Sequence, residues 1–200
     1  MKKIFYIFVI FLLKINIAHS LIEVDITRGN LDPLPIAISP LHVDPQSDNY
    51  KDIKTKDLGE LISSVVEKNF RSTGLFNPLN KEAFVQKPDI AHLKPRFEDW
   101  SLITAQALIT GKLLLKDEKL KIEFRLWDVA ANKEMIALAF TTTPSNWRRV
   151  AHIISDKIYE RLTGETGYFD TRIIYVSETG PRTQRVKKLA IMDQDGENTK

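Results

Sequence analysis

Between residues 119 and 128 the chain reads Lys119-Leu-Lys-Ile-Glu-Phe-Arg-Leu-Trp-Asp128, an alternation of polar and apolar side chains. Successive side chains of a β-strand point to opposite faces of its sheet. One face of this stretch is mostly charged, and the other is formed by Leu120, Ile122, Phe124 and Leu126. The alternation predicts a strand that is covered on one face and solvated on the other.

Similar stretches flank this strand on both sides. Residues 110–115 and 133–141 are rich in apolar and β-branched residues, and short turn-forming segments separate them from the central stretch. We therefore expect three antiparallel strands in sequence order. A further apolar run, residues 35–41, predicts another strand, closed by Pro40.

Two segments have the apolar spacing of amphipathic helices. The first starts at Thr55 as a possible N-cap and ends at Gly74, and its apolar residues are Leu58, Leu61, Ile62, Val65, Val66 and Phe70. The second starts near Ser145 and ends at Gly164, with a stripe formed by Trp147, Val150, Ile153 or Ile154, Ile158 and Leu162. Residues 34–164 are thus predicted to form an α/β domain, a two-layer sandwich in which two amphipathic helices lie on one face of a mixed β-sheet.

Residues 1–20 have the three parts of a secretory signal peptide. Lys2 and Lys3 precede the apolar run 4–13, and Ala18-His-Ser20 is a small-residue cleavage site. A membrane-spanning helix needs about 20 consecutive apolar residues, and Lys14 interrupts this run. We expect export and cleavage after Ser20, with an uncleaved anchor as the alternative.

The short alternation Ile22-Glu-Val-Asp-Ile26 follows the signal and predicts a strand. Residues 21–33 are expected to be a mobile segment, because a terminal strand is ordered only where something pairs with it. Such a strand can dock on its own domain or add to the sheet edge of a partner, with Val24 and either Ile26 or Ile22 in alternate pockets.

Charge and cysteine content exclude several classes of function. The chain has 29 basic and 26 acidic residues, and three of the basic ones, Lys2, Lys3 and Lys14, belong to the signal. The remaining surface is neutral and attracts no phosphate backbone, so nucleic acid is not an expected partner. The chain has no cysteine, which excludes disulfides, thiolate metal sites and a cysteine nucleophile.

We find no catalytic motif, and we expect no enzymatic activity, no cofactor and no small-molecule substrate. The glycines form neither G-x-G-x-x-G nor a Walker A loop, and no serine lies in G-x-S-x-G. His42, His92 and His152 are far apart in the sequence and form no metal-binding motif. Asp156 and Glu160, at i and i+4 on the second helix, are expected to face solvent.

After Gly167, two apolar stretches at 172–177 and 188–192 lead into Asp193-Gln-Asp-Gly196. They predict a hairpin and a tight turn, as at the start of a β-propeller blade. Asp193 and Asp195 also resemble half of a calcium loop, but a turn is favoured by the same residues. Because a lone hairpin is marginal in water, we interpret residues 167–200 as a truncated first blade, or alternatively as an unstructured tail.

Several segments occur in the same order as in the TolB family, the periplasmic propeller proteins of the Tol-Pal system, and resemble them. They are Pro35-Ile-Ala-Ile-Ser-Pro-Leu41, Ser72-Thr-Gly-Leu-Phe-Asn-Pro78, the helix from Trp147 to Gly164, and above all the portion from Thr163-Gly164 to Asp195-Gly196. The resemblance implies an N-terminal α/β domain followed by a six-bladed propeller. It implies a protein-binding role in the periplasm, linking inner-membrane Tol proteins to the outer membrane and peptidoglycan during cell division and maintaining outer-membrane integrity.

The resemblance also implies two partners. The inner-membrane-anchored protein TolA would contact the mature N-terminal segment, and the peptidoglycan-associated lipoprotein Pal would contact the propeller. Carried onto this chain, the TolA-binding residues are Ile22, Glu23, Val24, Asp25, Ile26 and Gly29. Most of the propeller is not part of this sequence, so the resemblance assigns no residue here to Pal. We interpret the chain as a fragment; the alternatives are the N-terminal part of an exported propeller-bearing hydrolase or peptidase, and an inactive remnant.

Overall fold

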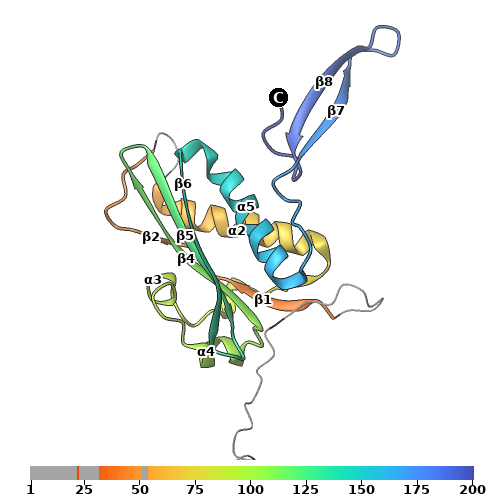
Figure 1. Ribbon diagram of the computed structural model, residues 1–200. Helices are drawn as coiled ribbons and strands as arrows, with labels where there is room; N and C mark the ends of the chain where they lie inside the picture. The colour runs from red at the N-terminus through yellow and green to blue at the C-terminus, as the bar shows by residue number, and fades with distance from the viewer. Residues whose placement is uncertain (1–21, 23–31, 51–53) are drawn as a thin grey trace, which may run out of the picture.

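A computed structural model describes residue 22, residues 32–50 and residues 54–200 of the chain (Figure 1). The predicted signal peptide, residues 1–20, and most of the segment 21–33 lie outside the described residues. The remainder forms an α/β body, from which a β-hairpin projects.

A mixed sheet of six strands forms one layer of the body. Its strands are β1 (Leu34–Ile38), β2 (His42–Val43), β3 (Phe76–Pro78), β4 (Ala107–Lys116), β5 (Lys119–Asp128) and β6 (Lys133–Thr142). The main path has the order β3-β1-β4-β5-β6, and β2 pairs with β4. β1 and β2 are parallel to β4, and β1 is parallel to β3, whereas β4, β5 and β6 are antiparallel. The predicted mixed sheet and its antiparallel meander are confirmed.

Two long helices, α2 (Thr55–Thr73) and α5 (Trp147–Thr163), lie on one face of this sheet, as predicted (Figure 1). Their apolar stripes and the apolar face of β5 form the main core. Both helices end at a glycine in the left-handed conformation, Gly74 with φ of 70° and Gly164 with φ of 75°, which glycine adopts without steric cost.

The predicted starts of both helices were slightly wrong. Thr55 lies within α2 rather than capping it, and its hydroxyl donates to the carbonyl oxygen of Asp48 at 2.6 Å. The residue at the cap position is Lys54, which makes no side-chain capping bond. The second helix begins at Trp147, because Pro144–Asn146 form a separate 3-10 turn, η2.

The other face of the sheet is covered at one end by a feature that the sequence did not predict as a layer. This cover consists of α3 (Pro88–Ala91) and α4 (Phe97–Leu102), whereas η1 (Lys81–Ala83) lies beside α2, where Lys81 pairs with Glu60 at 2.5 Å. Trp100 of α4 packs with Ala37 and Leu108 of the sheet in a second core cluster, and its indole N–H donates to Gln86 Oε1 at 3.0 Å. Within the part of the chain that is described, no helix is both long and apolar enough to cross a bilayer.

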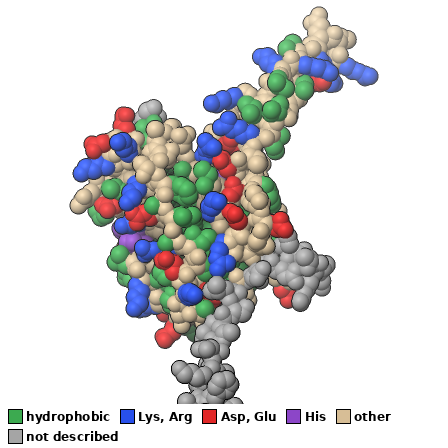
Figure 2. All heavy atoms as spheres, in the orientation of Figure 1, with side chains coloured by type: hydrophobic (Ala, Val, Ile, Leu, Met, Phe, Trp, Pro, Cys, Tyr) green, Lys and Arg blue, Asp and Glu red, His purple; other side chains and the backbone are tan. Residues whose placement is uncertain are grey.

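The C-terminal strands β7 (Arg172–Thr179) and β8 (Val186–Asp193) form the predicted hairpin rather than an unstructured tail. Many of its apolar side chains are exposed: Ile173, Ile174, Val176, Val186 and Leu189. Figure 2 shows these hydrophobic side chains along a thin projecting arm. Beyond the turn, the chain returns beside β8, and the backbone N–H and C=O of Lys200 both bond to Ile191. These two hydrogen bonds hold Lys200 beside β8.

Gly59 of α2 is required by a close approach between backbones. A Cβ atom at this position would overlap the carbonyl oxygen of Leu41, in the connection after β1. Alanine is favoured over glycine in a helix by about 1 kcal/mol, but overlap in a packed core typically costs about 1–3 kcal/mol. Because the overlap is with a backbone atom, which cannot turn aside as a side chain can, its cost should lie in the upper part of this range, about 2–3 kcal/mol. We therefore expect Gly59→Ala to lower the free energy of unfolding by about 1–2 kcal/mol, measured by urea denaturation. Lys56→Ala, on the exposed face of the same helix, should stay within about 0.5 kcal/mol of the parent; a G59A protein as stable as the parent would contradict the close approach.

A candidate site at the junction of the helices and the hairpin

The turn after β8 docks on the two long helices through polar contacts. Gln194 Nε2 donates to Asn69 Oδ1 on α2 at 3.1 Å, and Lys68 Nζ donates to the backbone oxygen of Asp195 at 3.4 Å. From α5, the guanidinium of Arg148 donates to the carboxylate of Asp195. We call the group of side chains that meet here the junction, and it comprises Asn69, Arg148, His152, Ser155, Gln194 and Asp195.

The hydrogen bonds of the junction determine the tautomer of His152. Ser155 Oγ donates to the carbonyl oxygen of Ala151 and therefore accepts from Asn69 Nδ2, at 2.9 Å. The same amide nitrogen lies 3.0 Å from His152 Nδ1, so Nδ1 acts as the acceptor. A neutral imidazole with an acceptor at Nδ1 carries its proton on Nε2. His152 is thus held neutral, with its remaining N–H directed toward the turn.

Charge at the junction is concentrated on one ion pair. The side chain of Asp195 is 3% exposed and that of Arg148 is 18% exposed. Burial alone would raise the pKa of Asp195, but the hydrogen bonds from Arg148 and from the Glu197 backbone N–H lower it below its usual value. Burial lowers the pKa of His152, and this effect outweighs the attraction of Asp195. The junction therefore combines an ionised carboxylate with an uncharged imidazole.

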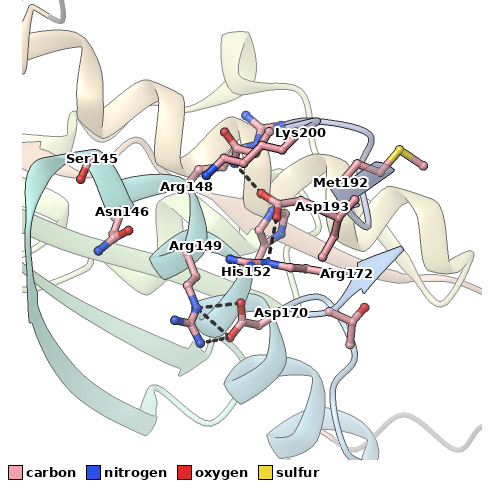
Figure 3. Close-up of a pocket in the computed structure, with 13 residues that line it drawn as sticks. Ser145, Asn146, Arg148, Arg149, His152, Asp170, Arg172, Met192, Asp193 and Lys200 are labelled. Carbon is pink, nitrogen blue, oxygen red and sulfur yellow. Dashed lines mark hydrogen bonds and ion pairs between the residues drawn. The ribbon is translucent and has the colours of Figure 1, made fainter. Parts of the chain in front are cut away.

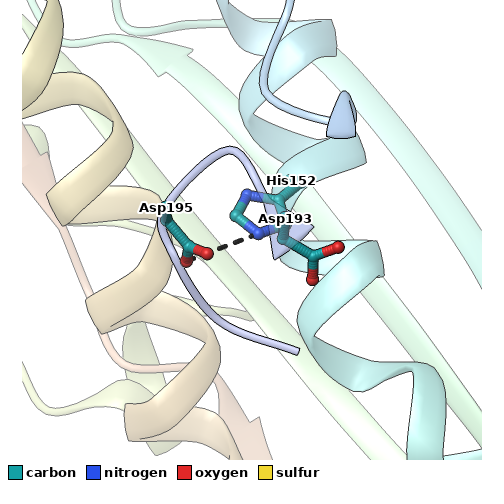
Figure 4. A group of neighbouring side chains, drawn as sticks. All are labelled: His152, Asp193 and Asp195. Carbon is teal, nitrogen blue, oxygen red and sulfur yellow. Dashed lines mark ion pairs between the residues drawn. The ribbon is translucent and has the colours of Figure 1, made fainter. Parts of the chain in front are cut away.

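Two residues of the junction, His152 and Asp195, form a metal-like cluster with Asp193, and the ligand atoms of the three lie within 4.8 Å of one another (Figure 4). Arg148 already donates to Asp195 Oδ2, so a guanidinium takes the place that a cation would need. The proton on His152 Nε2 also faces Asp195 Oδ2, at 3.6 Å, whereas a metal needs an unprotonated nitrogen. The donor set fits an ion-paired turn better than a metal site.

A polar cavity of about 300 Å³ opens beside the junction (Figure 3). Its arginines face carboxylates: Arg149 binds Asp170 at 3.1 Å, and Arg172 approaches Asp193 at 3.7 Å. These pairs, with Arg148 and Asp195, balance most of the charge that lines the cavity. The arrangement supports docking of the hairpin on α5 rather than chemistry on a substrate.

Asp156 was predicted to face solvent, and this prediction was wrong. Its half-buried carboxylate accepts the backbone N–H groups of Phe169 at 2.7 Å and Asp170 at 3.1 Å. Phe169 is fully buried and packs edge-on against Phe70 and Tyr159 in the main core. The segment that leads to the hairpin is therefore fixed to the body at two points. Glu160 is exposed, as predicted, and pairs with Lys157.

Two histidines that are far apart in the sequence also lie together in the structure. His42 of β2 and His92 after α3 stack with ring centroids 4.4 Å apart and parallel planes. Burial, followed by the charge of His92, lowers the pKa of His42. This pair lies away from the junction, on a different part of the body.

Of the predicted partner-binding residues, Ile22 lies within the described residues. Its backbone N–H donates to Asp128 Oδ2 at 3.1 Å, and its side chain packs against the main core. The others, Glu23, Val24, Asp25, Ile26 and Gly29, lie outside the described residues. The junction itself was not predicted from the sequence. Its one sequence signal is the placement of Arg148, His152 and Ser155 on a single face of α5, at i, i+4 and i+7.

The body and its hairpin define a class of protein, an α/β domain followed by the start of a separate β-structure. Residues 22–135 match the TolB amino-terminal domain family, and the chain belongs to this family. The predicted resemblance to TolB is therefore confirmed.

Two known proteins show the extent of the similarity. The Tol-Pal system protein TolB of Pelagibacter ubique (strain HTCC1062) is 69% identical over 197 residues, which are 98% of this chain and 44% of that protein. The crystal structure of TolB from Acinetobacter baumannii superposes with a TM-score of 0.67 at 23% identity, over 90% of this chain and 41% of that one. The second comparison supports the fold. The chain spans less than half the length of either protein.

The ion pair at the junction should hold the turn in place. We expect Asp195→Asn to weaken docking by about 2 kcal/mol, because a hydrogen bond to a charged group contributes about 1.5–3 kcal/mol. Hydrogen–deuterium exchange of residues 186–200 should then increase about thirtyfold, with little change in β4 and β5. Glu178→Gln removes an exposed ion pair with Arg185 within the same hairpin and should have little effect. Equal exchange in the two variants would contradict a docking role for Asp195.

Acid should destabilise the protein through His152. Its pKa is lower in the folded protein than the usual value of about 6.5, so the unfolded chain binds more protons below that pH and the free energy of unfolding falls as the pH drops. Protonation of Nδ1 would also oppose the Asn69 amide. The charged groups around the ring are Arg148 on α5, Asp193 at the end of β8, Asp195 on the turn after it, and Asp170 in the linker, the segment between α5 and β7.

The measurement is the urea midpoint at pH 7.5 and pH 5.5. We expect the urea midpoint to fall less between pH 7.5 and pH 5.5 in His152→Gln than in the parent. The amide oxygen of the glutamine can still accept from Asn69. His42→Gln is the comparison outside the junction: burial also lowers the pKa of His42, so its effect on the acid loss should add to that of His152→Gln rather than replace it. A His152→Gln protein with the full pH dependence of the parent would rule out this role.

Proposed function

We propose that the mature chain is a periplasmic, non-enzymatic, protein-binding component of the Tol-Pal system, exported by a signal peptide that is cleaved after Ser20. The observation that carries this proposal is the family match, together with the 69% identity to a relative named as a Tol-Pal system protein. In this role it links inner-membrane Tol proteins to the outer membrane and peptidoglycan during cell division and supports outer-membrane integrity.

The proposed binding segment for TolA runs from residue 21 to about residue 32 and includes the predicted contact residues Ile22, Glu23, Val24, Asp25, Ile26 and Gly29. Ile22 itself is bound to the body through its N–H and its packed side chain, so we propose that it anchors the segment and that the residues after it meet the partner. Asp128, which accepts the N–H of Ile22, is 1% exposed and also accepts the N–H of Ala131. The buried carboxylate of Asp128 therefore holds one end of the segment in place. In this proposal, the alternating residues after Ile22 pair with the sheet edge of a partner.

Residues 34–164 are proposed to be the folded platform for this segment, and residues 167–200 the first blade of a propeller. The exposed apolar side chains of the hairpin support the blade assignment, because blades bury such faces against their neighbours. In this proposal Pal binding belongs to the propeller, and no residue of this sequence is assigned to it.

Deletion of residues 21–32 tests the proposal. We expect the deletion to abolish capture of purified TolA in an isothermal titration, because it removes the pairing strand. The body should remain folded, with an unchanged far-ultraviolet circular dichroism spectrum, since its core comes from α2, α5 and the sheet. A control with Lys56→Ala on the exposed face of α2 should bind like the parent. Unaltered affinity after the deletion would reject the assignment of the segment.

A further inference from the structure

One edge of the sheet is unpaired over a long distance. β6 (Lys133–Thr142) is the last strand of the main path, and among residues 22, 32–50 and 54–200 no strand pairs with its outer side. The strand is ten residues long and contains no proline. A long edge of this kind presents a row of backbone N–H and C=O groups to which another strand can bond.

The helix-facing side of β6 is apolar and only partly covered. Its register places Ile136, Leu138 and Phe140 opposite Leu126, Phe124 and Ile122 of β5. The β5 side chains are buried, but Leu138 is 40% exposed and its two neighbours are half-buried. Figure 2 shows hydrophobic side chains gathered in the middle of this face, where β6 runs beside α5. An added strand would cover these side chains.

A groove between β6 and the C-terminal half of α5 is lined in part by charged side chains. Its cavity of about 440 Å³ is lined by Ile136, Lys157, Glu160, Arg161 and Gly164. Lys157 pairs with Glu160 at 2.9 Å. Arg161 is half-buried and makes no ion pair with any other described residue. Among the described residues, no carboxylate forms an ion pair with Arg161 in this groove.

We propose that β6 is a docking edge for an extended segment of a partner protein whose helix-facing side carries apolar residues and a carboxylate. The backbone of the segment bonds to the outer edge of β6, its apolar side chains cover Leu138 and Phe140, and its carboxylate pairs with Arg161. Alternate residues on the opposite side meet the small side chains of Ala137 and Ala139 and can be polar. This surface goes beyond the proposed function, in which the chain donates a strand, because here it accepts one.

The probe is a synthetic peptide with the sequence Glu-Thr-Val-Thr-Val-Thr-Glu, blocked at both ends and fluorescently labelled. Its valines and glutamates share one face, and its symmetry allows binding in either strand direction. We expect saturable binding to the chain in fluorescence anisotropy, and at least tenfold weaker binding of a peptide with lysine in place of both glutamates.

Two variants and one matched control test the location. Leu138→Glu should weaken binding of the acidic peptide at least tenfold, and Arg161→Glu should reverse the preference so that the lysine peptide binds better. Leu61→Glu, at a leucine of α2 that is 39% exposed, should change nothing. The circular dichroism spectra of all three should match the parent.

Absence of binding, equal affinity for the two peptides, or unaffected binding by Leu138→Glu would overturn the proposal. Self-association of the parent chain that Leu138→Glu abolishes, measured by sedimentation, would also overturn it, because the edge would then be occupied by a second copy.

Discussion

Burial of one face of β5 is the contact on which the rest of the body depends. Leu120, Ile122, Phe124 and Leu126 are almost completely buried, because β4 and β6 flank the strand and α5 packs over it. Each such side chain contributes about 1.5–3 kcal/mol when it is removed from water, and the chain has no cysteine to supplement this burial with disulfides. Because every second residue of β5 is apolar, the apolar side chains point to one face of the sheet, and both long helices lie on that face. The linker after α5 joins the same core through Phe169.

The hairpin is attached in a different way. It exposes much of its apolar surface and contacts the body mainly through polar groups of its terminal turn. A network of hydrogen bonds constrains the orientation of the groups it joins, since each donor must point at an acceptor. Asn69 illustrates this constraint, because its oxygen accepts from Gln194 while its nitrogen donates to Ser155 and faces His152. The junction therefore specifies how the hairpin is oriented on the helices, whereas the linker fixes where it starts.

Much of the fold could be predicted because its determinants are local. The alternation in β5 and the helical spacing in α2 and α5 follow directly from side-chain periodicity, and Gly74 and Gly164 indicate where the helices end. The junction depends on contacts between residues far apart in the sequence. Asp195 meets Arg148 and His152 only after the hairpin folds back on α5, and Asp156 appeared to be an ordinary exposed carboxylate until the linker brought the N–H groups of Phe169 and Asp170 to it. The layer around Trp100 was missed because α3 and α4 are too short to show a period.

The two edges of the sheet differ in a way that bears on partner binding. β3 has three residues and ends at Pro78, so that its edge is short and lacks a donor at its end, which are common means of preventing unwanted pairing. β6 is ten residues long with small or apolar residues at its centre. α5 borders this second edge with Arg161 and holds the hairpin turn with Arg148. A single rigid helix therefore sets the distance between the open edge and the hairpin, so that a strand bound at β6 would lie at a fixed position relative to any domain built on β7 and β8.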